Sequence, residues 1–296
     1  MNYPRSIRHS YGVLALFFVL VMTVTGSASL QAQSTSSSFA INGADVISGY
    51  PLEGHLIIAR TAPDYKVTLD GADVSVTDDG LFVIGFHRDS DDDVALKITD
   101  KNGVVLTTIL SPAQRDYNIQ RIDGLKQSMV TPPKAVLDRI KADSKKVREA
   151  RIMPAPLGDF WRGLDWPVLG RISGVFGSQR ILNGKPRAPH YGIDIAAPAG
   201  TPIHAPASGT ITLAYDLYYS GLTVILNHGL GVNSTFLHLQ NMAVTVGDQI
   251  ERGDLIGTLG STGRSTGPHL DWRLDWQGRR IDAQLIAGPM PAIPKT

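Results

Sequence analysis

At residues 260–273 the chain reads Gly-Ser-Thr-Gly-Arg-Ser-Thr-Gly-Pro-His-Leu-Asp-Trp-Arg, a glycine-rich loop that runs into a short predicted strand. Because side chains on a strand repeat every two residues, His269 and Asp271 are expected on one face. A similar pair stands upstream in His190-Tyr-Gly-Ile-Asp194, and His238 lies between the two clusters. A catalytic zinc takes three His or carboxylate ligands and keeps one open position. These residues therefore predict a three-ligand metal site with two further imidazoles that can move protons or stabilise an oxyanion.

Further segments extend this pattern along the chain in a fixed order. They are Gly200-Thr-Pro-Ile-His-Ala-Pro-Ala-Ser-Gly209, Asn227-His-Gly229, Phe236-Leu-His238-Leu, Val246-Gly-Asp-Gln-Ile-Glu-Arg-Gly253 and Ser261-Thr-Gly-Arg-Ser-Thr-Gly-Pro-His269. With them, the chain from about Trp166 to Ile286 resembles the lysostaphin-type zinc endopeptidases (the M23 or LytM-like family), which cut peptide bonds in peptidoglycan. The resemblance implies metal ligands at His190, Asp194 and Asp271 and catalytic histidines at His238 and His269.

One ligand departs from the family pattern. The family motif ends in His-x-His, whereas this chain reads His269-Leu-Asp271. A carboxylate binds zinc well and reaches about as far from Cβ as imidazole Nδ1 does, so Asp271 can replace a His that binds through Nδ1 with little backbone movement, but not one that binds through Nε2. Two carboxylates and one imidazole neutralise Zn²⁺ formally, which weakens it as a Lewis acid. We therefore expect a retained site with lower activity at neutral pH, or one tuned to Mn²⁺ or another oxygen-loving ion.

The expected fold is mostly β. Short alternating runs at 55–60, 65–69, 72–76, 81–86, 94–98 and 104–110 are separated by Asp-Gly and Asn-Gly turn signals, which favours an immunoglobulin-like β-sandwich over residues 36–130. A helix is expected from Thr131 to about Ala150, with Val136, Leu137, Ile140 and Val147 near one apolar face. It leads through a linker ending at 157 into a lysostaphin-type antiparallel β-sheet peptidase domain, residues 158–296.

The N-terminus predicts export. Arg5 and Arg8 precede an apolar run from Val13 to Val24 and then small residues, which is typical of a signal peptide covering residues 1–32. An uncleaved membrane anchor is the alternative, although this run is shorter than the roughly 20 residues that span a bilayer. The sequence has no cysteine, which excludes disulfides and thiolate ligands. A formal net charge of +1 gives no footprint for nucleic acid, and no further membrane span is expected after cleavage.

The function expected from the resemblance is a periplasmic or secreted zinc endopeptidase acting on peptidoglycan cross-links. The alternative is a catalytically impaired wall-binding or hydrolase-activating module on the same fold. Arg180 and Asn183, in the loop from Gly177 to Gly184, are candidates for lining the substrate cleft. His228 is interpreted as a structural residue near the site, and His204 as a strand residue.

Overall fold

The computed structural model describes residues 39–122, 136–182 and 184–292. Residues 39–296 form one compact unit. The predicted signal peptide and the predicted helix start at Thr131 lie outside the described residues. Within the described ranges, no helix is long and apolar enough to cross a membrane.

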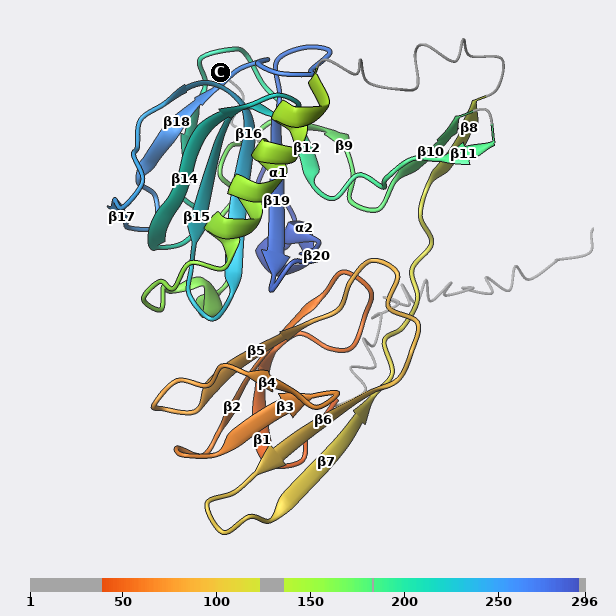
Figure 1. Cartoon of the computed structure of the whole chain (residues 1–296), viewed down its shortest axis with the longest axis vertical. Coiled ribbons are helices and arrows are strands. Elements are labelled where there is room, and N and C mark those ends of the chain that lie inside the picture. The colour runs from red at the N-terminus through yellow and green to blue at the C-terminus, as the bar shows by residue number, and fades with distance from the viewer. Residues whose placement is uncertain (1–38, 123–135, 183, 293–296) are drawn as a thin grey trace, which may run out of the picture. The chain divides into compact units, whose positions relative to one another are not determined.

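Seven antiparallel strands form the N-terminal β-sandwich (Figure 1). One sheet has the order β1-β2-β5 and the other the order β4-β3-β6-β7, an arrangement of the immunoglobulin-like kind. Their bounds are β1 (Ala44–Ser48), β2 (Leu56–Thr61), β3 (Lys66–Leu69), β4 (Ala72–Val74), β5 (Leu81–Gly85), β6 (Val94–Thr99) and β7 (Val105–Leu110). The expected mostly-β fold is confirmed, but the sequence analysis missed β1. That strand carries Asp45 and Ser48 with little burial, so it has no clear apolar alternation.

The C-terminal part is built on one ten-stranded sheet with the main order β17-β14-β15-β16-β19-β12-β9. β13 and β18 pair with each other beside this path, β18 also pairs with β16, and β20 pairs with β19. The bounds are β9 (Arg171–Gly174), β12 (Ile193–Ala196), β13 (Pro202–His204), β14 (Gly209–Leu217), β15 (Gly221–Asn227), β16 (Val232–Met242), β17 (Gln249–Ile250), β18 (Leu255–Leu259), β19 (Leu270–Trp276) and β20 (Arg279–Ile281). A one-turn helix, Phe160–Arg162, and a short helix, α2 (Ala283–Ala287), complete it.

Strand β19 is the centre of this sheet. It lies between β16 and β12, and its Trp272, Leu274 and Trp276 are fully buried. Six of the seven residues of β19, Leu-Asp-Trp-Arg-Leu-Asp-Trp, are buried, and these include Asp271 and Asp275. A carboxylate in such a place needs a partner, and this requirement shapes the site described below.

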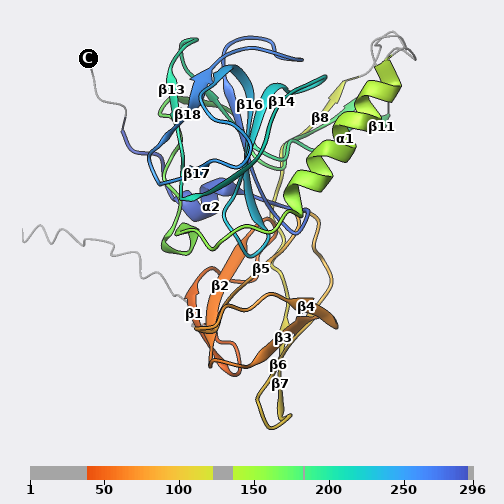
Figure 2. The same cartoon turned by 60° about the vertical axis from the view of Figure 1, so that its left-hand side comes forward.

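The long helix α1 (Leu137–Arg151) packs on the sheet and is more than a connector (Figure 2). Val147 and Ala150 contact Leu213, Leu217 and Ile225 of β14 and β15. The expected apolar face was wrong at its N-terminal end, where Leu137 is 38% exposed. Near the middle of the helix, the Asp143 carboxylate accepts a hydrogen bond from the Tyr218 amide at 2.8 Å.

A small separate sheet holds the loop that precedes the first histidine cluster. Strand β8 (Ile119–Ile122) runs parallel to β10 (Gln179–Leu182), which also pairs with β11 (Lys185–Pro186). The chain that leaves the β-sandwich thus contributes backbone hydrogen bonds to the predicted cleft loop.

Candidate metal centre

Two neighbouring strands place the acidic residues of the site opposite each other. In the antiparallel pair β12 and β19, Asp194 is the register partner of Asp271. His190 stands just before β12, in a turn fixed by two backbone hydrogen bonds: its amide donates to the Ser178 carbonyl and its carbonyl accepts from the Gly177 amide, both at 2.8 Å. Directly opposed residues on paired strands have closely spaced side chains. The sheet register thus brings together residues that are 77 positions apart.

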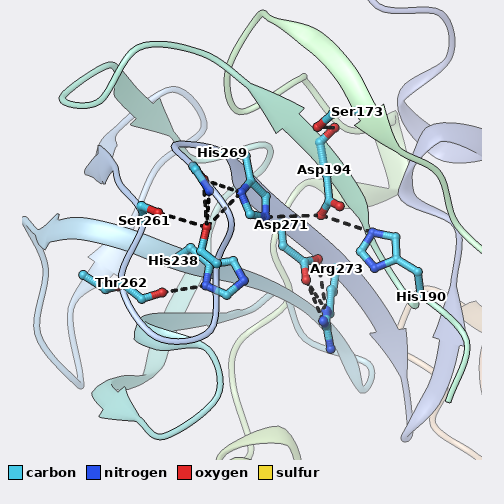
Figure 3. A network of polar contacts seen from close by, with 11 residues as sticks. Ser173, His190, Asp194, His238, Ser261, Thr262, His269, Asp271 and Arg273 are labelled. Atoms are coloured by element: carbon cyan, nitrogen blue, oxygen red, sulfur yellow. Dashed lines mark hydrogen bonds and ion pairs between the residues drawn. The ribbon is translucent and has the colours of Figure 1, made fainter. Parts of the chain in front are cut away.

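The three predicted ligands form a cluster that can hold a metal ion. One donor atom from each of His190, Asp194 and Asp271 lies within 4.8 Å of the other two (Figure 3). His190 Nε2 lies 3.2 Å from Asp194 Oδ1. Both atoms are buried, and neither has a hydrogen-bond partner of good geometry among the described residues. Buried polar atoms without partners are rare in folded proteins, and a bound metal ion would satisfy both of these atoms.

Two glycines make the room that the carboxylates occupy. A Cβ added to Gly174 would lie 2.2 Å from Asp194 Oδ2, and a Cβ added to Gly192 would lie 2.2 Å from Asp271 Oδ1. Neither distance is compatible with a real side chain, so any other residue would push the carboxylate aside. The donor set of one imidazole and two carboxylates suits zinc and also more oxygen-loving divalent ions. The residues present therefore fit a divalent metal.

The guanidinium of Arg273 lies beside Asp271. Arg273 Nε lies 3.0 Å from both carboxylate oxygens, and Arg273 Nη2 donates to Oδ2 at 2.5 Å. Burial raises the pKa of Asp271, whose residue is only 3% exposed, but the Arg273 guanidinium outweighs burial and holds this pKa below its usual value. Asp271 is therefore ionised. Arg273 was not among the residues predicted from the sequence, although its position two residues after Asp271 places it on the same face of a strand.

His238 reaches the site through an irregularity in β16. Between Phe236 and Leu239 this strand has one residue more than its partner β15, which is a β-bulge. His238 has φ +63°, in the left-handed region, and its amide donates to the Ser220 carbonyl at 2.9 Å. Bulges re-aim side chains next to functional sites, and here the bulge places His238 beside the cluster of His190, Asp194 and Asp271 (Figure 3).

The two candidate catalytic histidines present the same ring nitrogen for chemistry. His238 Nδ1 lies 2.8 Å from the Thr262 carbonyl and His269 Nδ1 lies 2.8 Å from the Gly267 carbonyl, so each Nδ1 is the protonated donor. Each Nε2 is then left as a lone-pair acceptor. The ring centroids are 4.9 Å apart, and His269 Nε2 is 3.7 Å from Asp194 Oδ1. Burial lowers the pKa of His238, which keeps it neutral and able to accept a proton.

The remaining candidates differ in what the structure says of them. Arg180 lies in β10, where its backbone pairs with Gln120 of β8, and Asn183 lies outside the described residues. The assignment of both to substrate binding stays a prediction. His228 is fully buried, and burial lowers its pKa to about 4. Its Nδ1 contacts the Ser208 carbonyl at 2.8 Å and its Nε2 contacts Ser234 Oγ at 2.9 Å, as expected of a structural residue.

The part of the chain that carries this cluster matches a known protein family. Residues 188–283 match the model of peptidase family M23, and this range includes all five histidine and aspartate residues of the site. The segment belongs to peptidase family M23. A Pseudomonas aeruginosa protein of known crystal structure, assigned to peptidase M23, has 28% sequence identity and a TM-score of 0.64. It covers 82% of this chain and 97% of its own, so the likeness extends beyond the M23 segment.

Part of the chain also resembles curated proteins that are named as endopeptidases. Peptidoglycan DD-endopeptidase ShyA of Vibrio cholerae is 38% identical over 127 residues, which are 42% of this chain and 30% of ShyA. DD-carboxypeptidase/endopeptidase Mpg of Neisseria meningitidis is 39% identical over 126 residues, which are 43% of this chain and 29% of Mpg. The chain thus spans about 30% of the length of these curated relatives.

Proposed function

We propose that this protein is an exported zinc metalloendopeptidase that hydrolyses peptide bonds in peptidoglycan cross-links. The observation that carries the proposal is the convergence of three metal-competent donors with two imidazoles whose Nδ1 atoms are both held by backbone carbonyls, which leaves Nε2 of each ring for chemistry. His190, Asp194 and Asp271 would hold the ion. A bound divalent zinc supplies Lewis acidity, which polarises a carbonyl and lowers the pKa of water.

The histidines would supply the proton transfers. A peptide bond is hydrolysed when water loses a proton as it attacks the carbonyl carbon, and the leaving amine then gains one. His238 or His269 accepts the first proton at Nε2, because Nδ1 of each ring is tied to a backbone carbonyl. The other imidazole, when it is protonated at Nε2 as well, donates from Nε2 to the developing oxyanion, and one of the two returns a proton to the amine.

The substrate class is supported by the relatives. ShyA is named as a peptidoglycan DD-endopeptidase and Mpg as a DD-carboxypeptidase/endopeptidase. The cell envelope is where such a substrate is found, in agreement with the predicted signal peptide. Peptide cross-links of the wall would be the partner of the cleft.

Digestion of purified peptidoglycan tests the proposal. The protein loaded with Zn²⁺ or Mn²⁺ is incubated with peptidoglycan, with and without a chelator, and released fragments are identified by mass. We expect new peptide-bond cleavage that the chelator abolishes. His269→Ala should abolish it with the metal content unchanged, whereas His204→Ala, at an exposed histidine outside the cluster, should not. A folded, metal-loaded protein that releases nothing would instead favour a wall-binding or hydrolase-activating module.

A further inference from the structure

Arg273 competes for the carboxylate that the metal needs. Its guanidinium touches both oxygens of Asp271 and, within the described residues, makes no other ion pair with an acidic side chain within 4.0 Å. The Asp271 side chain is 4% exposed and that of Arg273 is 28% exposed, so water weakens this pair little. In the sheet register Asp271 faces Asp194, a like charge. Without a cation between or beside them, two partly buried carboxylates repel each other.

The formal charges of the site can be counted. One imidazole and two carboxylates carry −2, so a divalent metal would bring the cluster to zero. Arg273 adds +1 and restores the net charge that a metal held by two imidazoles and one carboxylate has. In the absence of metal, the same guanidinium leaves the cluster at −1 instead of −2.

We infer that Arg273 is the resident counterion of this site: it preassembles the two carboxylates before metal binds and opposes the metal electrostatically afterwards. The inference rests on the proposed function in so far as the ion bound at His190, Asp194 and Asp271 is a divalent metal. Arg273 is a positioning residue, because it acts through Asp271. The positive charge of Arg273 lowers the affinity for metal. The same charge makes the metal site more positive, and a metal in it would lower the pKa of bound water more strongly.

Two other roles for Arg273 predict different results. A residue that only orients a ligand strengthens metal binding, and its removal typically weakens affinity about 10–100-fold. A residue that only stabilises the fold leaves metal affinity unchanged when it is removed. A counterion gives the opposite sign: by reciprocity of coupling, removing it tightens metal binding and makes stability depend more on metal.

The test is zinc affinity of the full chain, measured by competition with a chromophoric chelator. Arg273→Gln keeps a donor of similar length without charge, and we expect it to bind Zn²⁺ about tenfold more tightly than the wild type, as removal of a neighbouring unit charge implies. Arg273→Lys keeps the charge and should stay within about threefold of the wild type. Thermal melting at rising zinc concentration gives the same comparison even where the metal-free variant is mostly unfolded.

The outcomes separate this inference from the proposed function. Unchanged or weaker zinc binding by Arg273→Gln, with a wild type that binds zinc, overturns the counterion role and leaves the metallopeptidase proposal standing. If Arg273→Gln binds zinc and the wild type does not, the result supports the counterion role and contradicts the proposed activity of the native chain. No zinc binding by either protein overturns both.

Discussion

The buried imidazole of His228 should make the stability of the protein depend on pH. Burial lowers its pKa to about 4, partly offset by the contact with the Ser208 carbonyl, whereas an unfolded chain has the ordinary value of 6.5. The Trp272 Nε1 donates to Ser234 Oγ at 3.4 Å, Ser234 Oγ contacts His228 Nε2, and Nδ1 contacts the carbonyl. These contacts are complete with a neutral ring, in which Nδ1 donates to the Ser208 carbonyl and Nε2 accepts from Ser234 Oγ.

The sign follows from the two pKa values. Below pH 6.5 the unfolded chain binds a proton that folded His228 refuses, so stability present above pH 6.5 is lost as the pH falls towards 4. Each pKa unit corresponds to about 1.4 kcal/mol, and integration from pH 7.5 to pH 5.0 gives a loss of about 2 kcal/mol from this residue alone.

His228→Gln isolates this contribution. Urea unfolding of the metal-free protein at pH 7.5 should show the variant to be about 2–3 kcal/mol less stable than the wild type, since a buried hydrogen-bonded group is lost. At pH 5.0 that difference should narrow by about 2 kcal/mol, because the variant has no ring to protonate. Phe160→Leu is the matched control: this buried ring lies 6.2 Å from His228 and does not titrate.

For Phe160→Leu, the difference in free energy of unfolding from the wild type should be the same at pH 7.5 and pH 5.0. A His228→Gln difference that is equally large at pH 7.5 and pH 5.0 would refute the reasoning, because the imidazole would then be protonated to the same extent in the folded and unfolded chains.

Three further changes test the site and its support. His238→Ala should lower kcat about 10²–10⁴-fold with zinc content unchanged, as measured by digestion kinetics and metal analysis, because it removes a proton acceptor and no ligand. Gly192→Ala should reduce zinc affinity, since its Cβ would lie 2.2 Å from Asp271 Oδ1, whereas Gly267→Ala, with open space around it, should not. Asp275→Ala should lower the free energy of unfolding by about 3 kcal/mol, because the half-buried Arg151 and Arg280 lose their counterion, and urea unfolding measures this.

The sequence predicted the parts of the molecule that local patterns encode. The Asp70-Gly71, Asp79-Gly80 and Asn102-Gly103 pairs marked the turns of the β-sandwich, and the structure has strands on both sides of each. The ligand cluster was predicted from spacing and from the family resemblance, and the structure brings its members together.

What the sequence could not predict depends on contacts between distant segments. The gaps that Gly174 and Gly192 leave for the two carboxylates arise from strand register, which a single sequence does not reveal. The helix α1 packs through Val147 and Ala150, and this depends on where β14 and β15 lie. The apolar pattern of the helix alone therefore did not predict which of its residues are buried. Thr131 and Asn183, which carried two further predictions, lie outside the described residues.

At the bulge, the backbone conformation of His238 lowers stability, whereas its imidazole serves the proposed activity. A histidine with φ +63° holds a backbone conformation that glycine or asparagine adopts more easily, and relief of such strain is typically worth about 1 kcal/mol or more. A library selected only for heat resistance would therefore be expected to lose the imidazole and keep the bulge. By the same reasoning, His238→Gly would give a more stable variant that lacks the proposed proton acceptor and keeps the cluster of His190, Asp194 and Asp271. Such a variant would suit structural work on a bound, uncut peptide.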